Sequence, residues 1–241
     1  MGDRSLPLGA LAMAETLRSS VSILIDSVRG RLTREACDRR IAEWSGRLVR
    51  EAAVELDVSG QEHVPRDGET FVVMSNHQSN FDIPVLFQVF PGSMRMLAKS
   101  ELYRIPVFGN AVRAAEFIEV DRQNPERARQ SIEVAKQRLK SGIHIWVAPE
   151  GTRSSEGRLG PFKKGGFVLA LDTGARILPI TLDGTRRVQP PHTNRVHPHQ
   201  RVMVRFHPPI DAASYGYERR DELVAAVRSA IASALPEDLR G

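Results

Sequence analysis

The segment NHQSNFD, residues 76–82, holds two side chains that could carry out acid–base chemistry. A neutral imidazole such as that of His77 can take a proton from a hydroxyl near pH 7. A carboxylate on its second nitrogen, such as that of Asp82, would fix the tautomer and stabilise the imidazolium. Pro84 indicates a helix beginning near Asp82, and a strand-to-helix turn can bring positions five apart into contact. The spacing also fits a helix-capping aspartate beside an ordinary loop histidine.

Other chemistries fit this segment less well. The chain has no G-x-S-x-G sequence for a nucleophilic serine, and its only cysteine, Cys37, has no histidine nearby in the sequence. We therefore expect His77 to activate a hydroxyl of a substrate. A metal site would need a third ligand, and one cysteine excludes a cysteine-based zinc site within the chain. Prolines surround His192, His197 and His199 and acidic partners are absent, which favours a solvated loop over a zinc site.

Basic residues gather at or just past the predicted strand ends, which suits an anionic substrate: Lys99, Arg122, Arg153, Lys163 and Lys164. Residues 149–166, PEGTRSSEGRLGPFKKGG, add glycines, hydroxyls and backbone donors. Neither a Walker loop nor a G-x-G-x-x-G dinucleotide sequence is present. We expect Glu150 to hold Arg153 or a backbone donor in place, or to accept a hydrogen bond from a substrate hydroxyl.

Short alternating segments separated by helical ones must position these residues. The predicted strands are 53–58, 70–75, 95–99, 116–120, 143–148, 176–182 and 201–206. Helices are predicted over 124–141, about 163–173 and about 218–235. This alternation predicts an α/β domain with a largely parallel sheet. Because functional groups collect at the carboxyl ends of such strands, we expect His77, Arg122 and the 149–154 segment to converge on one cleft.

Residues 8–53 read as two amphipathic helices. Their apolar stripes are predicted to hold Leu11, Ala14, Leu17, Val21, Leu24, Val28 and Leu32 in the first helix, and Cys37, Ile41, Trp44, Leu48 and Ala52 in the second. Arginines mixed with acidic residues occupy the opposite faces. This pattern fits a hairpin packed on its own domain, and it also fits a pair lying on a membrane surface.

Composition sets broad limits on the function. The 241 residues carry a formal net charge of +5, which suits a phosphorylated substrate, an acidic lipid surface or nucleic acid without choosing among them. Aromatic residues make up only 6% without basic–aromatic interleaving, which argues against single-stranded nucleic acid as a partner. Charged residues interrupt the N-terminal apolar stretches, so neither a secretory signal nor a transmembrane helix is expected. The single cysteine fits a reducing compartment.

Several segments together resemble the glycerolipid acyltransferases. NHQSNFD is similar to their first block, N-H-x-x-x-x-D, and the segments similar to the later blocks are EFIEVDR (116–122), APEGTRS (148–154) and ILPI (177–180). AKSEL (98–102) is similar to a segment that the family places between its first two blocks. Two acidic residues depart from the second block: Glu116 stands where glycine is common, and Glu119 where an aromatic residue is common. Such carboxylates would weaken anion binding unless they point away, and strand alternation puts them on opposite faces.

The resemblance implies a single mostly parallel, mixed central sheet flanked by helices, with an N-terminal hairpin. It implies domains at 1–53 for membrane association and 54–241 for the α/β acyltransferase. The implied reaction moves a fatty acyl group from acyl-CoA or acyl carrier protein to the free hydroxyl of a lysophospholipid such as 1-acyl-glycerol-3-phosphate. His77 and Asp82 would be catalytic. The substrate-binding residues would be Lys99, Arg122, Glu150, Gly151, Thr152 and Arg153.

No metal, organic cofactor or nucleic acid is implied. The membrane-surface reading of residues 8–53 gains weight with a lipid substrate, and peripheral association with the cytoplasmic face of the cell membrane is expected. Two alternatives remain. In one, the same His–Asp pair activates water, as in a thioesterase or lipid ester hydrolase. In the other, the protein binds lipid without catalysis.

Overall fold

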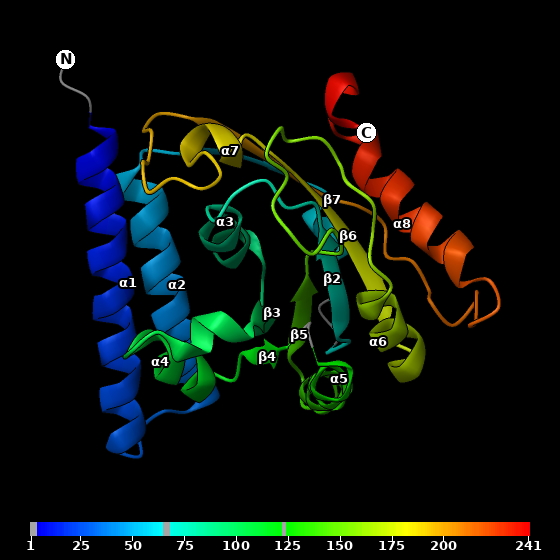
Figure 1. Cartoon of the computed structure of the whole chain (residues 1–241), viewed down its shortest axis with the longest axis horizontal. Coiled ribbons are helices and arrows are strands. Elements are labelled where there is room, and N and C mark those ends of the chain that lie inside the picture. Colours follow the sequence, from blue (N-terminus) through cyan, green and yellow to red (C-terminus); the bar gives the residue numbers. More distant parts are fainter. Residues whose placement is uncertain (1–3, 65–67, 122–123) are drawn as a thin grey trace.

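A mixed sheet forms the centre of the molecule, which is a computed structural model that describes residues 4–64, 68–121 and 124–241 (Figure 1). The strands of this described part are β1 (Glu55–Ser59), β2 (Phe71–Ser75), β3 (Met94–Lys99), β4 (Ile118–Val120), β5 (His144–Val147), β6 (Arg176–Asp183) and β7 (Arg201–Phe206). Their order is β1-β7-β6-β2-β5-β3-β4, and β6 with β7 is the one antiparallel pair of named strands in this part of the chain. The largely parallel sheet predicted from the sequence is confirmed. The carboxyl ends of β6, β2, β5, β3 and β4 therefore share one edge.

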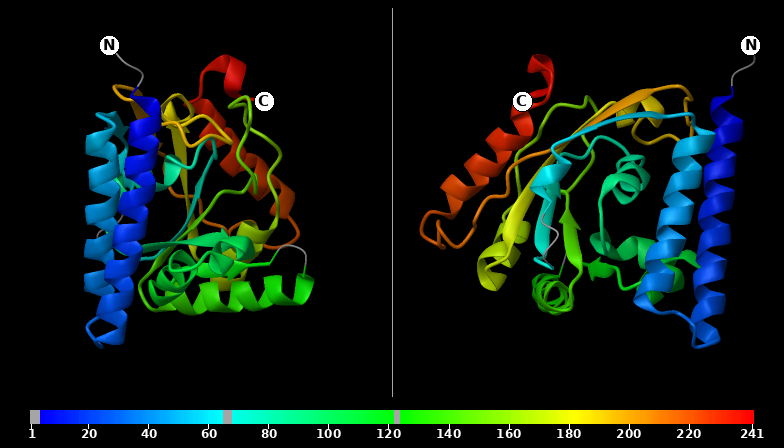
Figure 2. Two further views of the ribbon diagram at one scale, coloured as in Figure 1. Left: turned by 60° about the vertical axis from the view of Figure 1, so that its left-hand side comes forward. Right: turned by 180° about the vertical axis from the view of Figure 1, so that it is seen from behind.

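Helices cover both faces of this sheet. They are α1 (Ser5–Val28), α2 (Arg34–Glu51), α3 (Asp82–Val89), α4 (Phe108–Ala114), α5 (Pro125–Lys140), α6 (Gly165–Thr173), α7 (Thr185–Val188) and α8 (Arg220–Ser233). The hairpin of α1 and α2 stands beside α3 and α4 on one side, while α5, α6 and α8 lie on the other (Figures 1 and 2). The central strand β2 joins the two layers: Phe71 and Val73 pack with α2 and α3, whereas Val72 and Met74 pack with α5, α6 and α8. This is the two-residue period of a strand buried on both faces.

The three helices predicted in the second half of the chain are found, with the expected ends. The Asn124 side chain accepts hydrogen bonds from the backbone N–H groups of Glu126 and Arg127, so it caps α5. Gly174 ends α6 in the left-handed conformation at φ +67°. In α8 the side chains of Leu223, Val227 and Ile231, spaced four apart on one face, are buried. The short helix α7 was not predicted, and it lies in the segment 183–200 that the sequence presents as irregular.

Residues 8–53 form the predicted hairpin, and α1 packs on the domain through a face other than its apolar stripe. In α2 the stripe residues Cys37, Ile41 and Leu48 are buried as expected. The inward face of α1 holds small or polar residues such as Gly9, Ser19 and Ser20. Glycine is needed at position 9, because a Cβ there would lie 1.7 Å from the carbonyl oxygen of Asn194.

The large apolar side chains of α1 consequently face outward. Leu17, Val21 and Val28 of the predicted apolar stripe are exposed, together with Leu6, Met13 and Ile25. Small residues let the helix backbone approach the domain closely, and these stripe residues are left uncovered. Of the two placements that the sequence allowed, packing on the domain is seen for the small-residue face of α1, and the membrane contact of its apolar stripe stays a prediction.

One helix of the described chain, α1, is long and apolar enough to cross a membrane by length and composition, with a mean hydropathy of 1.3 over an 18-residue window. The expectation that α1 does not span a membrane stays a prediction, since Glu15, Arg18 and Asp26 are spread along the helix. All three charges are paired: Glu15 accepts a hydrogen bond from Arg18 at 2.7 Å, and Asp26 accepts one from Arg40 at 3.0 Å. A core helix or a signal sequence meets the same criterion.

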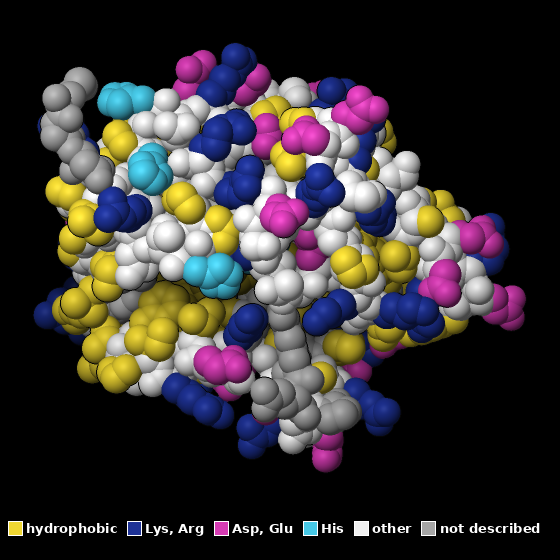
Figure 3. Space-filling model, turned by 45° about the horizontal axis from the view of Figure 1, so that its top comes forward, with side chains coloured by type: hydrophobic (Ala, Val, Ile, Leu, Met, Phe, Trp, Pro, Cys, Tyr) yellow, Lys and Arg dark blue, Asp and Glu magenta, His cyan; other side chains and the backbone are white. Residues whose placement is uncertain are grey.

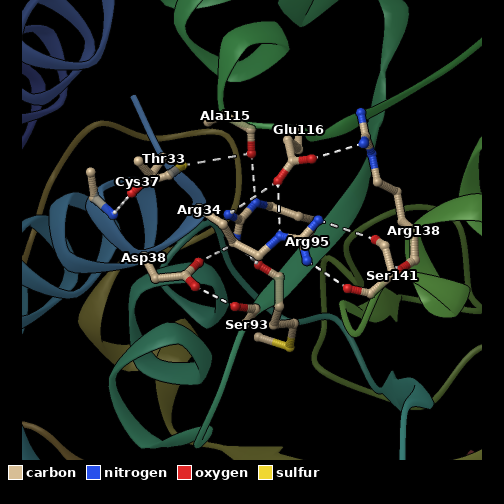
Figure 4. A network of polar contacts seen from close by, with 12 residues as sticks. Thr33, Arg34, Cys37, Asp38, Ser93, Arg95, Ala115, Glu116, Arg138 and Ser141 are labelled. Carbon is tan, nitrogen blue, oxygen red and sulfur yellow. Dashed lines mark hydrogen bonds and ion pairs between the residues drawn. The ribbon is translucent and has the colours of Figure 1, made fainter. Parts of the chain in front are cut away.

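A buried charge network fastens the hairpin to the sheet (Figure 4). Arg95 of β3 is fully buried, and its guanidinium contacts Asp38 of α2 at 2.6 Å and the carbonyl oxygen of Ala115. Ser93 also donates a hydrogen bond to Asp38. Arg34 of α2 donates to the carbonyl oxygen and the hydroxyl of Ser141, just after α5. These contacts join α2 to β3 and to the end of α5.

Glu116 belongs to this network, which explains a departure from the family pattern. It precedes β4 and adopts a left-handed backbone at φ +66°, a conformation that favours glycine. Its carboxylate lies 2.8 Å from Arg138, 3.4 Å from Arg34 and 4.0 Å from Arg95. Placing it in a strand was therefore wrong. Glu119 is in β4 and pairs with Arg113 at 3.5 Å.

Candidate active site

The side chain of Asn76 fixes the point where β2 ends. Its amide donates to the carbonyl oxygen of Leu182 and accepts from the backbone N–H of the same residue, both at 2.8 Å. Backbone pairing between β2 and β6 ends at Ser75. Just beyond it, the Asn76 amide binds the backbone of β6 as a paired strand would. The next residue, His77, is held at the shared carboxyl edge of the sheet.

His77 and Asp82 are in direct contact. Nδ1 of His77 lies 2.7 Å from Oδ2 of Asp82. The same oxygen accepts hydrogen bonds from the backbone N–H groups of Gln78 at 2.8 Å and Ser79 at 3.0 Å. Asp82 is completely buried, whereas the His77 side chain is 18% exposed. The carboxylate is therefore fixed inside the turn while the ring reaches the surface.

The polar residues between His77 and Asp82 tie this turn to its surroundings. The hydroxyl of Ser79 donates to the carbonyl oxygen of Gln189 at 2.7 Å and accepts from the backbone N–H of Phe81 at 2.9 Å. The amide of Gln78 donates to the carbonyl oxygen of Gly157 at 3.3 Å. The turn is thereby attached to the segment after α7 and to the loop after β5.

Glu150 holds the loop after β5 against the same turn. Its two carboxylate oxygens accept from the backbone N–H of His77 at 2.7 Å and from that of Gly160 at 2.8 Å. Burial raises the pKa of Glu150, and these two backbone donors oppose that rise. The backbone N–H of Ser154 also donates to the carbonyl oxygen of His77 at 2.9 Å. Of the roles considered for Glu150, holding backbone donors is the one seen here.

The remaining residues predicted to bind substrate are placed as follows. Gly151 has a φ of +73°, and the side chain of Lys163 lies against it, 3.0–3.2 Å from where a Cβ would be. Thr152 is exposed and Arg153 is half-buried in the same loop. Lys99 lies at the end of β3, and within the described chain no hydrogen bond or ion pair joins it to these residues. Arg122 lies outside the described residues.

Two further side chains lie near these residues: Lys164, one of the basic residues singled out from the sequence, and Trp146, which contacts His77. Lys164 pairs with Asp221 of α8 at 2.8 Å, so its charge is already balanced. The Trp146 ring meets that of His77 edge to face, with centroids 6.1 Å apart, and its indole N–H donates to Ser75 at 3.0 Å. Sequence reasoning missed Trp146, because nothing near it in the chain connects it to a histidine 69 positions earlier.

An apolar cavity of about 540 Å³ borders the same turn. Asn80 and Phe81, which lie between His77 and Asp82, line it together with Ile83, Pro84 and Phe87. Its other walls come mainly from α1, α2 and the segment 102–117. Figure 3 shows a hollow lined by hydrophobic side chains, with a histidine and basic side chains at its rim.

No group of three or more histidine, cysteine, aspartate or glutamate side chains that could hold a metal ion occurs in residues 4–64, 68–121 and 124–241.

The sequence and the fold resemble those of known proteins. The family model described as Acyltransferase matches residues 55–183. The chain is 35% identical over 179 residues to "1-acyl-sn-glycerol-3-phosphate acyltransferase BAT2, chloroplastic" of Brassica napus, a match that covers 74% of this chain and 50% of that protein. It is 33% identical over 177 residues to "1-acyl-sn-glycerol-3-phosphate acyltransferase" of Escherichia coli (strain K12), covering 72% of this chain and 71% of that one. The chain spans about half the length of the Brassica napus protein and of the similar proteins of Arabidopsis thaliana and Cocos nucifera.

A solved structure shares the fold. The crystal structure of the 1-acyl-sn-glycerophosphate (LPA) acyltransferase PlsC from Thermotoga maritima superposes with a TM-score of 0.72 and 26% sequence identity. The similarity covers 91% of this chain and 94% of that one, so it includes most of the N-terminal hairpin region as well as the sheet.

Proposed function

Since the chain belongs to the acyltransferase family that includes the 1-acyl-sn-glycerol-3-phosphate acyltransferases, we propose that it acylates a lysophospholipid. The proposed acceptor is 1-acyl-glycerol-3-phosphate, the proposed donor is acyl-CoA or acyl carrier protein, and the product is phosphatidic acid. One observation carries this proposal: the turn that holds the contact between His77 and Asp82 also forms a wall of a large apolar cavity.

His77 is the general base in this mechanism. Oδ2 of Asp82 already accepts two backbone N–H bonds, so we assign the Nδ1 proton to the imidazole as a third donor. The other ring nitrogen, Nε2, then carries the lone pair. It takes the proton from the acceptor hydroxyl as the hydroxyl oxygen attacks the thioester carbonyl carbon.

The resulting tetrahedral intermediate collapses when the carbon–sulfur bond breaks. The thiolate leaves, and the imidazolium of His77 returns the proton to the sulfur, so the ring is neutral again at the end of the cycle. Asp82 stabilises the imidazolium between the two steps. Trp146 packs edge-on against the ring and keeps it from turning away.

The acceptor phosphate is proposed to lie on the loop after β5. Arg153 and Lys163 stand there, and neither has an acidic partner in the described chain. We retain the expectation that Lys99 and Arg122 approach the same anion and that Gly151 and Thr152 shape its site. Glu150 acts as a positioning residue, since its oxygens hold the backbone of His77 and Gly160.

The apolar cavity is proposed to hold the fatty acyl chain. Its lining is mainly aliphatic and aromatic and holds no charged side chain, which suits hydrocarbon better than the charged head of the lipid. Because Asn80 and Phe81 belong both to its wall and to the catalytic turn, an acyl chain inside it would present its carboxyl end to His77.

The hairpin of residues 1–53 is proposed as the part that meets the membrane. Met13 and Leu17 line the cavity and are also 62% and 54% exposed, so the cavity wall continues into the apolar outer face of α1. A face of this kind binds the interface of a bilayer. We infer that the enzyme lies on the cytoplasmic face of the cell membrane, which agrees with its single, unpaired cysteine.

The proposal is tested with purified protein, labelled acyl-CoA and a panel of acceptors: lysophosphatidate, lysophosphatidylcholine and monoacylglycerol. Labelled phosphatidate as the main product is expected. Release of labelled fatty acid at a rate that lysophosphatidate does not change would instead support a hydrolase, in which His77 activates water.

A further inference from the structure

Arg186 of α7 is a basic residue that lies beside the catalytic turn although it belongs to none of the motifs discussed above. The chain on both sides of it is tied to that turn. Leu182, four residues earlier, is bound at its N–H and its carbonyl by Asn76, and Gln189, three residues later, accepts a hydrogen bond from Ser79. The backbone on both sides of Arg186 is therefore held against the turn that contains His77.

The guanidinium of Arg186 rests on the loop after β5. A Cβ at Gly157 would lie 3.2 Å from Nε and 3.4 Å from Cζ of Arg186, so glycine leaves the space that the guanidinium occupies. Gly157 has a φ of +84°, and its carbonyl oxygen accepts the hydrogen bond from Gln78, the neighbour of His77. Gly157 thus contacts both the guanidinium of Arg186 and the turn that holds His77 and Asp82.

Arg186 differs from the next residue in its charge partners. Arg187 lies 3.6 Å from the carboxylate of Asp183 and donates to the carbonyl oxygen of Arg201 at 3.4 Å. No acidic partner of Arg186 is found among residues 4–64, 68–121 and 124–241, although its side chain is partly buried. A partly buried guanidinium without a carboxylate is suited to an anion from outside the protein.

Lys163 is placed on the same loop in the same way. Its side chain covers Gly151 as that of Arg186 covers Gly157. Lys163 and Arg186 come from different parts of the chain and each lies against one left-handed glycine of this loop, Gly151 or Gly157. Arg153 lies between these two glycines in the sequence. The carboxylate of Glu150 nearby is already bound to two backbone N–H groups. In the part of the chain that the structure describes, no ion pair joins Arg153, Lys163 or Arg186 to an acidic side chain.

We propose that Arg186 binds a phosphate oxyanion of a substrate, and so adds a contact from α7 to the anion site on this loop. The proposal rests on the proposed function for the identity of the two substrates that bring phosphate. The anion is either the phosphomonoester of lysophosphatidate or a phosphate of CoA. A guanidinium binds either one through two parallel N–H groups.

The test compares R186Q with the matched control R187Q, which removes the neighbouring arginine of the same helix. Loss of a charge-assisted hydrogen bond is expected to raise KM for one substrate roughly ten- to a hundredfold in R186Q. KM and kcat of R187Q should match the wild type. R186K should recover part of the loss, because it restores the charge without the fork.

The two phosphate sources separate in the same experiment. A KM effect on lysophosphatidate that disappears with monoacylglycerol assigns Arg186 to the acceptor, and an effect on acyl-CoA assigns it to the donor. A lower kcat in R186Q with both KM values unchanged would mean that Arg186 only supports the loop, and would overturn the proposal. Equal kinetic constants in R186Q and R187Q would overturn it as well.

A measurement of ligand binding tests the anion contact of Arg186 independently of whether the protein transfers acyl groups. Dissociation constants for CoA and for lysophosphatidate in detergent micelles are measured with wild type, R186Q and R187Q, and no turnover is needed. Tenfold or greater weakening of one ligand in R186Q alone is expected, even if the wild type transfers no acyl group. Equal affinities in the two variants, or no binding of either ligand to the wild type, would contradict the anion contact.

Discussion

At the scale of the residue, the polar side chains of the segment 76–82 have separate and traceable tasks. His77 and Asp82 contact each other across five positions. This contact was one of two interpretations that the spacing and the residue types allowed, and the resemblance to the acyltransferases favoured it. The partners of three others were not predictable. Asn76, Gln78 and Ser79 bind Leu182, Gly157 and Gln189, which are 106, 79 and 110 positions away. A local pattern contains no information about contacts that only the strand order creates.

Replacing Asp82 by asparagine tests its role as the group that orients His77. D82N is expected to lower kcat by roughly 10²- to 10⁴-fold, because the amide no longer stabilises the imidazolium or fixes the Nδ1 proton. The control D57N changes an exposed aspartate that pairs with Arg201 at the far edge of the sheet. The measurement is steady-state kinetics. If folded D82N turns over at the wild-type rate, Asp82 has no role in the mechanism.

At the scale of the element, the strands and the long helices were predictable and the packing of α1 was not. Caps such as Asn124 and Gly174 are local signals, and they mark the ends of α5 and α6 correctly. The face that α1 turns inward depends on the close approach of Gly9 to Asn194, 185 positions away. Arg95 is similar: its strand was predicted, but its complete burial depends on Asp38 of another element.

Replacing Arg95 by methionine tests whether the buried network holds the hairpin on the domain. R95M leaves Asp38 and Glu116 without their shared partner, and we expect the free energy of unfolding to fall by roughly 2–4 kcal/mol. This is below the loss for a fully buried pair, because the Asp38 side chain is 30% exposed.

The measurement is urea denaturation, with R39M as the control. Arg39 is exposed on α2, the helix that also holds Asp38, and it has no ion pair or side-chain hydrogen bond in the described chain. Amide hydrogen exchange should also rise in α2 of R95M. Surface substitutions change the free energy of unfolding by roughly 0.5 kcal/mol or less. If the free energies of R95M and R39M differ by no more than that, the buried network does not hold the hairpin on the domain.

At the scale of the whole molecule, the apolar outer face of α1 and the apolar cavity lie on the same side. The sequence left two placements open for the hairpin, on its own domain or on a membrane. The two placements turn out to be compatible, because the small inward residues of α1 meet the domain while Leu6, Met13, Leu17, Val21, Ile25 and Val28 remain exposed. Neither hydrophobic periodicity nor composition could separate these faces, since the buried face carries glycine and serine.

The double variant V21Q/I25Q tests the membrane contact without touching the cavity. Both side chains are exposed on α1 and neither lines the cavity. Burying two such side chains in a bilayer interface stabilises binding, and we expect their loss to weaken vesicle binding roughly tenfold or more. Sedimentation with phosphatidylglycerol-containing vesicles measures it. The control V134Q/Y217Q removes two exposed apolar residues elsewhere. Equal binding of both variants would exclude α1 as the contact.

The most direct measurement for the whole account is acyl transfer by wild type and H77A, with H192N as the control. His192 is exposed in a loop with φ +62°, which asparagine tolerates. The account predicts transfer of labelled acyl groups from acyl-CoA to lysophosphatidate by wild type and H192N, and a rate lower by roughly 10²- to 10⁴-fold in folded H77A. Wild-type rates in H77A would contradict it.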